Sequence, residues 1–267
     1  MKLANTLIPE NRVFGFTLVE MAMVLTIVAL LLTGLVPTIS SQLEQRKISE
    51  TKSKLIDIQQ ALIGFALING RLPCPSQSSL ATGTADAGIE ATIANTCACV
   101  TAGGGVASAD ASRVACTATS VTGVLPWATL GISETDAWNR RFTYRVTKRF
   151  ADEIAAGTTD CTPAVTAPAA SSFALCSKGV PDILSAGSTP VAAAVPAVFV
   201  SHGMNGAGAF ISNGIQLTVS SNSDEVENSD NDKNFVSHEF TPGYDDLLGW
   251  IPSSILFSKM VSAGKLP

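Results

Sequence analysis

The stretch Gly15-Phe16-Thr17-Leu18-Val19-Glu20 opens the segment that decides the fold, and it is followed at once by Met21-Ala22-Met23-Val24-Leu25-Thr26-Ile27-Val28-Ala29-Leu30-Leu31-Leu32. No charged residue occurs between Met21 and Leu43. A helix rises about 1.5 Å per residue, so the roughly 20 residues needed to cross a bilayer core fit within residues 16–36. The sequence therefore predicts a transmembrane helix over residues 16–36.

One carboxylate, that of Glu20, lies just inside this apolar segment. A charged side chain within a bilayer costs a few kcal/mol unless it is paired, so an acid in this position is a candidate functional residue. The carboxylate needs a cation close by, and the apolar segment itself offers none.

A short polar leader, residues 1–15, precedes the apolar segment and carries the charged residues Lys2, Glu10 and Arg12. With Gly15 at the cut, Phe16 at the new amino terminus and Glu20 at the fifth position after the cut, this arrangement resembles a type IV prepilin. The resemblance implies cleavage between Gly15 and Phe16 by prepilin peptidase, which then N-methylates Phe16. It also implies a single-pass protein of the bacterial inner membrane, with its C-terminal domain in the periplasm.

The resemblance further implies assembly into a filament with other pilin or pseudopilin subunits, through the N-terminal helix and with an inner-membrane assembly platform. The Phe16 ammonium created by cleavage could pair with Glu20 of a neighbouring subunit, which would neutralise both charges in an apolar core. Gly34 and Pro37 weaken the helix and would let it bend during assembly.

Two simpler interpretations of the apolar segment compete with this one. An ordinary secretory signal would be cut after the segment, at a site resembling Ala-x-Ala. The region 36–41, Val-Pro-Thr-Ile-Ser-Ser, offers no good match to such a site. The other alternative is a plain membrane anchor in which the acid is incidental.

Composition limits the classes of function. The 267 residues carry a formal net charge of −5, and removal of a leader with a net charge of +1 would leave −6. An acidic chain does not favour binding to nucleic acid through a basic face. The roughly 200 residues beyond the leader and the apolar helix are enough for one exported domain.

The six cysteines all follow the apolar helix, and their even number is typical of disulfides in an exported domain. They are Cys74, Cys97, Cys99, Cys116, Cys161 and Cys176. We expect a local Cys161–Cys176 bridge, and a bridge from Cys74 to Cys97, Cys99 or Cys116. Zinc at Cys97-x-Cys99 is the alternative, although no Cys-x-x-Cys pair and no nearby histidine accompany it.

Helix-favouring residues continue beyond Pro37, and residues 40–69 form an amphipathic segment. Leu55, Ile58, Leu62 and Phe65 recur at helical spacing, which predicts one long helix from Phe16 to about Ile68. Asn69-Gly70 followed by two prolines is a stop signal. Residues 70–267 would then form the globular domain.

Several short segments of this domain have strand character. Alternation predicts a strand at residues 142–146, and residues 198–201 and 215–219 are further strand candidates. Residues 247–251 and 255–260 are apolar segments that close the chain. Long loops rich in Ala, Thr and Gly separate these segments. A long helix followed by short strands predicts an α+β fold, with the helix packed on a small antiparallel sheet in a pilin-like arrangement.

The globular part carries a second resemblance, to the major pseudopilins of type II secretion. It rests on Leu72-Pro73, on Asp136-Ala137-Trp138-Asn139 leading into Phe142-Thr143-Tyr144, on Val200-Ser201-His202-Gly203-Met204-Asn205-Gly206-Ala207-Gly208, and on Asp245-Asp246 shortly before Trp250. Ala137 and Asn139 depart from the family's Asp-Pro-Trp-Gly turn, and the loops here are longer. A minor-pilin subfamily would share the same features.

This second resemblance implies a structural calcium ion in the late acidic loops. Calcium prefers oxygen ligands, and we favour Asp224, Glu225, Asp230, Asp232 and Asp245 among the acids of this region. The alternative is a solvated acidic loop, which is the usual role of a run of charges. The spacing excludes an EF-hand.

The pattern gives little support to catalysis. His202 and His238 are the only histidines, and neither a Gly-x-Ser-x-Gly nor a His-Glu-x-x-His motif is present. The sequence predicts a structural filament subunit rather than an enzyme, most specifically a type II secretion pseudopilin. The alternatives are a minor pilin of a type IV pilus and a membrane-tethered binding module that does not polymerise.

Overall fold

A computed structural model describes residues 15–93, 96–99, 114–115, 119–152, 161 and 170–267, without the side chains of residues 32–40, 99, 114 and 115. The chain divides into two compact units, Met1–Arg46 and Lys47–Pro267. The predicted leader, apart from Gly15, lies outside the described residues.

One helix, α1 (Leu18–Asn69, 52 residues), belongs to both units. The sequence places its ends at Phe16 and about Ile68. At its C-terminal end the Gly70 N–H donates to the Ala66 carbonyl over 2.8 Å, and Gly70 has a φ of 71°. Glycine adopts this left-handed conformation at little cost, so the helix ends where the Asn-Gly pair predicts.

The predicted membrane span needs correction. Among the helices that the structure describes, none combines the length and the apolar character required to cross a bilayer. This finding contradicts the predicted transmembrane helix over residues 16–36 and the predicted single-pass location in the inner membrane.

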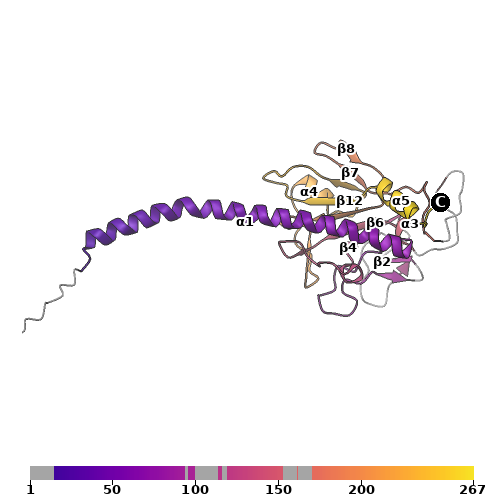
Figure 1. The fold of residues 1–267 in the computed structure, drawn as a ribbon, viewed down its shortest axis with the longest axis horizontal. Helices are drawn as coiled ribbons and strands as arrows, with labels where there is room; N and C mark the ends of the chain where they lie inside the picture. The colour runs from indigo at the N-terminus through magenta and orange to yellow at the C-terminus, as the bar shows by residue number, and fades with distance from the viewer. Residues whose placement is uncertain (1–14, 94–95, 100–113, 116–118, 153–160, 162–169) are drawn as a thin grey trace, which may run out of the picture. The chain divides into compact units, whose positions relative to one another are not determined.

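The second unit is a mixed α+β structure centred on a four-stranded sheet (Figure 1). The strand order is β12-β9-β6-β4, and each neighbouring pair is antiparallel. The strands are β4 (Ser120–Val124), β6 (Thr143–Thr147), β9 (Ala197–Ser201) and β12 (Leu247–Ile251). Two of them match predicted strands: β6 matches 142–146 and β9 matches 198–201. β12 coincides with the closing apolar segment 247–251, for which no strand is predicted.

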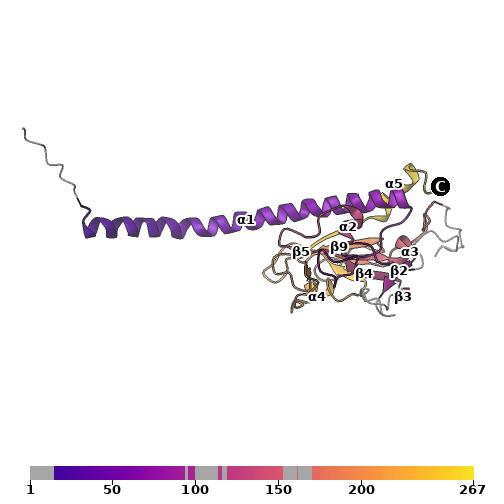
Figure 2. The same ribbon diagram turned by 90° about the horizontal axis from the view of Figure 1, so that it is seen from below.

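The second half of α1 covers one face of this sheet (Figure 2). The helix contributes Leu55, Ile58, Leu62 and Ala66 to the main core. The first three belong to the predicted apolar stripe. The sheet contributes Tyr144, Val146, Ala197, Phe199 and Ile251, and α5 (Ser253–Ser262) adds Leu256 and Met260. Apolar burial of this kind contributes about 25 cal/mol per Å².

The opposite face of the sheet is buried as well. Val198 and Val200, which alternate with Ala197 and Phe199 along β9, pack in a second core with Ile183. Ile183 lies in a three-stranded sheet of order β11-β7-β8, built from β7 (Asp182–Leu184), β8 (Pro190–Ala192) and β11 (Asn234–Val236). Successive side chains of a strand point to opposite faces, so β9 is buried along its whole length.

Smaller elements complete the described structure. They are β1 (Thr92–Ile93), β2 (Thr96–Cys99), β3 (Val114–Ala115), α2 (Trp127–Leu130), β5 (Arg140–Arg141), α3 (Lys148–Ala151), β10 (Phe210–Ile211) and α4 (Ser223–Glu227). The strand expected over 215–219 does not form; only Gln216 makes an isolated bridge, to Phe210. At the sheet edge, the Gln59 Nε2 donates to the Trp250 carbonyl over 2.8 Å.

Two disulfides tie the second unit together. Cys161 is joined to Cys176, the local bridge that the sequence predicts, and Cys74 is joined to Cys97, one of the three partners left open. Both Cys74 and Cys97 are fully buried. The side chain of Cys99 and the whole of Cys116 lie outside the described residues.

Candidate cation site

The register of two neighbouring strands builds a cluster of carboxylates. Leu247 of β12 lies opposite Ser201 of β9 in an antiparallel pair. Continuing this register by one residue brings Asp246, just before β12, opposite His202, just after β9. The His202 Nδ1 and the Asp246 Oδ1 are 3.8 Å apart, and both side chains are buried.

The turn after β9 lies directly against Asp245. A Cβ on Gly203 would lie 2.1 Å from the Asp245 carbonyl oxygen, and the φ of Gly203 is +54°, so both contact and conformation require glycine here. Two residues further on, the Asn205 N–H donates to the Asp245 Oδ2 over 2.8 Å. The turn therefore fixes one oxygen of this carboxylate.

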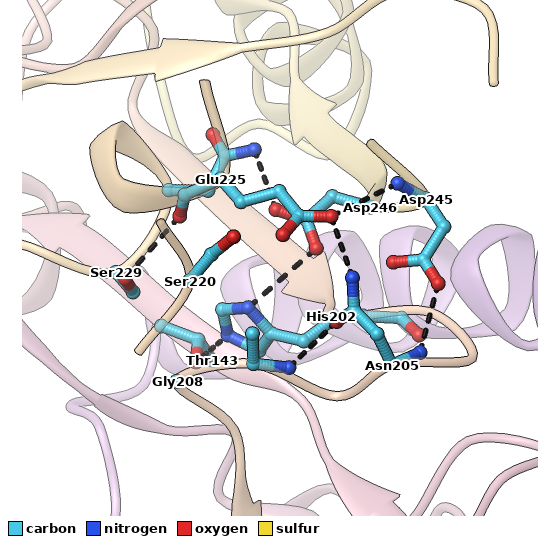
Figure 3. A network of polar contacts seen from close by, with 12 residues as sticks. Thr143, His202, Asn205, Gly208, Ser220, Glu225, Ser229, Asp245 and Asp246 are labelled. Carbon is cyan, nitrogen blue, oxygen red and sulfur yellow. Dashed lines mark hydrogen bonds and ion pairs between the residues drawn. The ribbon is translucent and has the colours of Figure 1, made fainter. Parts of the chain in front are cut away.

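The third carboxylate comes from α4. The Asn222 side chain caps this helix by accepting from the Asp224 and Glu225 N–H groups, which aims Glu225 into the interior. Glu225 Oε1 accepts from the Asn205 Nδ2 over 2.8 Å and from the Asp245 N–H over 3.2 Å (Figure 3). Asn205 thus orients both Glu225 and Asp245.

Glu225, Asp245 and Asp246 each offer a carboxylate oxygen within 4.8 Å of the other two. Within the described part of the chain, no lysine or arginine forms an ion pair with any of the three. The Asp245 Oδ1 and the Asp246 Oδ1 are buried and have no hydrogen-bond partner among the described groups. Burial of several carboxylates without a counter-charge is strongly unfavourable.

This crowding shifts the pKa values. Burial raises the pKa of Asp246 well above its usual value, and the charges of Glu225 and Asp245 raise it further, while a hydrogen bond from Asn228 lowers it. Burial and the charge of Glu225 also raise the pKa of Asp245. Without a cation, the cluster therefore favours proton uptake.

The residues fit a calcium ion. Oxygens that bind one calcium at 2.3–2.6 Å can be at most about 5 Å apart, a limit that the three carboxylates meet. The unpartnered oxygens of Asp245 and Asp246 provide free ligand atoms. The amide oxygen of Asn205 accepts from the Ala207 N–H over 2.7 Å, so Asn205 serves to orient the acids.

The structure brings together only two of the five acids favoured for calcium, Glu225 and Asp245. Asp224 Oδ2 instead lies 3.1 Å from the His238 Nε2. Asp230 accepts from the Asp232 N–H, and Asp232 accepts from the Asn234 N–H, both in an exposed turn. The sequence does not favour Asp246 as a ligand, although its neighbour Asp245 is among the five favoured acids.

Two contacts of His202 bear on catalysis. The Thr143 Oγ1 lies 2.8 Å from the His202 Nε2, and the Asp246 carboxylate lies on the other side of the imidazole. A hydroxyl, an imidazole and a carboxylate in this order are the groups of a nucleophile activated by a general base. Efficient general-base catalysis needs a pKa near the working pH. Burial lowers the pKa of His202 to about 4, and the 3.8 Å gap to Asp246 is too long for a hydrogen bond. These features argue against activation of Thr143 as a nucleophile.

The residues predicted for processing and assembly lie in the first unit. Gly15 and Phe16 precede α1 and are exposed, Phe16 to 74%. Glu20 lies in the first turn of α1 and is exposed. Gly34 and Pro37 lie within the helix, where the structure describes the backbone alone.

Comparison of the chain with protein-family models, with curated proteins and with solved structures finds no match. The class of protein must therefore be argued from the chain's own residues.

Proposed function

We propose that the protein is a structural subunit of a pilin-like filament, most specifically a pseudopilin of a type II secretion system. Cleavage by prepilin peptidase between Gly15 and Phe16 would produce the mature subunit. The observation that carries this proposal is the exposed apolar start of α1 with one acid in its first turn. Its exposed apolar side chains include those of Leu18, Val19, Leu25, Leu30 and Leu31.

The proposed occupant of this apolar surface is the same helix of other copies. Helices with apolar side chains on all sides need cover on all sides, which a bundle of identical helices supplies. Charge complementarity supports this choice, because cleavage would place an ammonium on Phe16, four residues before the Glu20 carboxylate. Pairing of these groups between copies would set the register of neighbouring subunits.

The cluster of Glu225, Asp245 and Asp246 supports a second part of the proposal, a structural calcium ion in the globular unit. The ion would hold the turn after β9, helix α4 and the start of β12 together. The observation favouring it is the pair of unpartnered buried oxygens on Asp245 and Asp246. Calcium would supply a direct counter-charge, which no lysine or arginine among the described residues gives these three carboxylates through an ion pair.

An in-frame deletion strain tests the proposed function. Loss of exported enzymes with normal surface pili would support a type II secretion pseudopilin. Normal secretion with loss of pili would support the minor-pilin alternative. A deletion strain normal in both respects, together with a chain that stays monomeric in the parent strain, would contradict the filament proposal and leave a binding module that does not polymerise.

A further inference from the structure

A cavity of about 290 Å³ lies in the second unit, next to the carboxylate cluster. One of the residues that line it, Asn228, touches the cluster directly, because its Nδ2 donates to the Asp246 Oδ2 over 2.8 Å. A second lining residue, Thr143, contacts His202, which lies beside Asp246. The volume is at the lower end of the range of about 300–1,000 Å³ that is usual for small-molecule sites. It would hold a single ring-sized ligand.

The lining of the cavity is neutral. None of the described residues that line it carries a formal charge, although the chain as a whole is acidic. Hydroxyl and amide side chains supply the polar lining. A charged ligand would find no counter-charge among these lining residues. The Arg145 guanidinium behind them already donates to the Thr122 Oγ1 and to the Asn231 carbonyl. Because a charged ligand would also lose hydration on entry, the lining favours an uncharged ligand.

Hydrogen-bonding groups remain available in the cavity. The hydroxyl of Ser78, a buried residue, and the side-chain amide of Asn231, an exposed residue, form no side-chain hydrogen bond with the described residues. The Thr122 Oγ1 accepts from the Arg145 Nη1 over 2.6 Å, which leaves its own hydrogen free to donate. A ligand rich in hydroxyls could satisfy donors and acceptors of this mixed kind.

Two phenylalanines, Phe210 and Phe235, add apolar surface to the lining. A sugar ring combines an apolar C–H face with hydroxyls at its edge, and so matches a site with both aromatic and polar lining. The Asn228 side chain in the lining is held in place before any ligand arrives, because it donates to the Val236 carbonyl and accepts from the Val236 N–H. A rigid site spends less of its binding energy on ordering side chains.

We propose that this cavity binds one ring of a neutral carbohydrate. The site is separate from the apolar start of α1 and does not depend on filament assembly. Neutral hexoses or N-acetylhexosamines would enter with the ring against the aromatic wall and with hydroxyls facing Ser78 and Asn231. Uronic acids and free hexosamines, which are charged at neutral pH, would bind more weakly.

Saturation-transfer NMR on the full chain, kept in solution by a zwitterionic detergent that carries no sugar, tests this proposal. The probes are a neutral hexose, an N-acetylhexosamine, a uronic acid and a hexosamine. We expect transfer to the neutral sugars at millimolar concentration and little transfer to the charged ones. No transfer to any neutral sugar, or equal transfer to all four, would overturn the proposal.

Variants locate the site. Ser78→Ala and Asn231→Gly should each weaken binding of the neutral sugar about fivefold, as expected for loss of one hydrogen bond. Glycine is chosen at 231 because Asn231 has a φ of 65°. Ser221→Ala, at an exposed serine outside the cavity, is the matched control. Unchanged binding in both cavity variants would overturn the proposal, and if Ser78→Ala loses its melting transition, the exposed Asn231→Gly decides.

Discussion

The hydroxyl of Thr17 and the carboxylate of Glu20 cap the first turn of α1 reciprocally. The Glu20 N–H donates to the Thr17 Oγ1 over 3.2 Å, and the Thr17 N–H donates to the Glu20 Oε2 over 3.4 Å. This is the capping box of a Thr-x-x-Glu sequence. Glu20 therefore has a local role in a single subunit, and that role requires only a hydrogen-bond acceptor, whereas pairing with an ammonium requires a negative charge.

The two roles of Glu20 can be separated by substitution. Glu20→Gln keeps an acceptor for the capping box but loses the charge, and Glu20→Ala loses both. We expect both variants to be cleaved by prepilin peptidase and both to fail to enter filaments, as measured by the processed band and by sedimentation of sheared filaments. Thr17→Ala, which weakens only the cap, should still assemble. Normal assembly of Glu20→Gln would show that the local cap suffices and that no ion pair is needed.

Calcium should stabilise the second unit through Glu225, Asp245 and Asp246. At a calcium concentration 100-fold above Kd, the gain is about 2.7 kcal/mol, which corresponds to roughly 5–10 °C in melting temperature. Asp246→Asn should abolish most of this shift and should raise the melting temperature in chelator, because it removes one of three crowded charges. Asp230→Asn, in an exposed turn outside the cluster, is the control. Equal melting temperatures in calcium and in chelator would rule out the ion.

His202 should make stability depend on pH. Its pKa in the folded protein is about 4, below the ordinary value of about 6.5, so the unfolded chain binds the proton more tightly. The contribution of neutral His202 to the free energy of unfolding is therefore fully present above about pH 6.5. It falls by about 3 kcal/mol as the pH drops towards 4.

The groups that act on this imidazole are the buried Glu225, which raises its pKa, and Arg140, which lowers it; Asp246 lies beside it. These groups remain in His202→Gln, so the difference between the two proteins isolates the histidine. Chemical denaturation in chelator between pH 4 and pH 7.5 should show wild type losing more stability than His202→Gln on acidification. Parallel pH profiles would contradict the assignment.

The two described disulfides should differ in resistance to reduction. Cys74 and Cys97 are fully buried, whereas Cys176 is exposed. A thiolate must reach a sulfur atom to exchange with it, so a graded dose of reductant should open Cys161–Cys176 first. Alkylation followed by mass spectrometry of peptides measures the order. Earlier opening of Cys74–Cys97 would contradict the burial argument.

Each bridge also closes a loop, with a sequence separation of 23 residues for Cys74–Cys97 and 15 for Cys161–Cys176. Loss of either bridge should lower the free energy of unfolding by about 3 kcal/mol.

Local pattern predicted much of the described fold. The helix from Leu18 to Asn69 follows from its periodicity and its Asn-Gly stop, and strand β6 follows from alternation. The apolar segment 215–219 looked like a strand but forms only one isolated bridge. Strand pairing depends on partners distant in sequence, which local propensity does not reveal.

The residues of the candidate cation site were also hard to predict from local sequence. The resemblance favours Asp224, Asp230 and Asp232 as members of the late acidic loops, but the Asp224 side chain contacts His238, and turn contacts engage Asp230 and Asp232. Asp246 joins the cluster because β12 pairs with β9 in a register that places it opposite His202. Such a register becomes evident only when both strands are placed, so sequence spacing alone could not rank Asp246 above the exposed acids.

The hydrogen bond from Gln59 to the Trp250 carbonyl limits how copies of this chain can associate. β12 is at one end of the four-stranded sheet, where an open backbone would invite strand-to-strand aggregation. A side chain from α1 occupies one of the acceptors that an added strand would need. Sheet extension from one copy into the next is thereby discouraged at this edge.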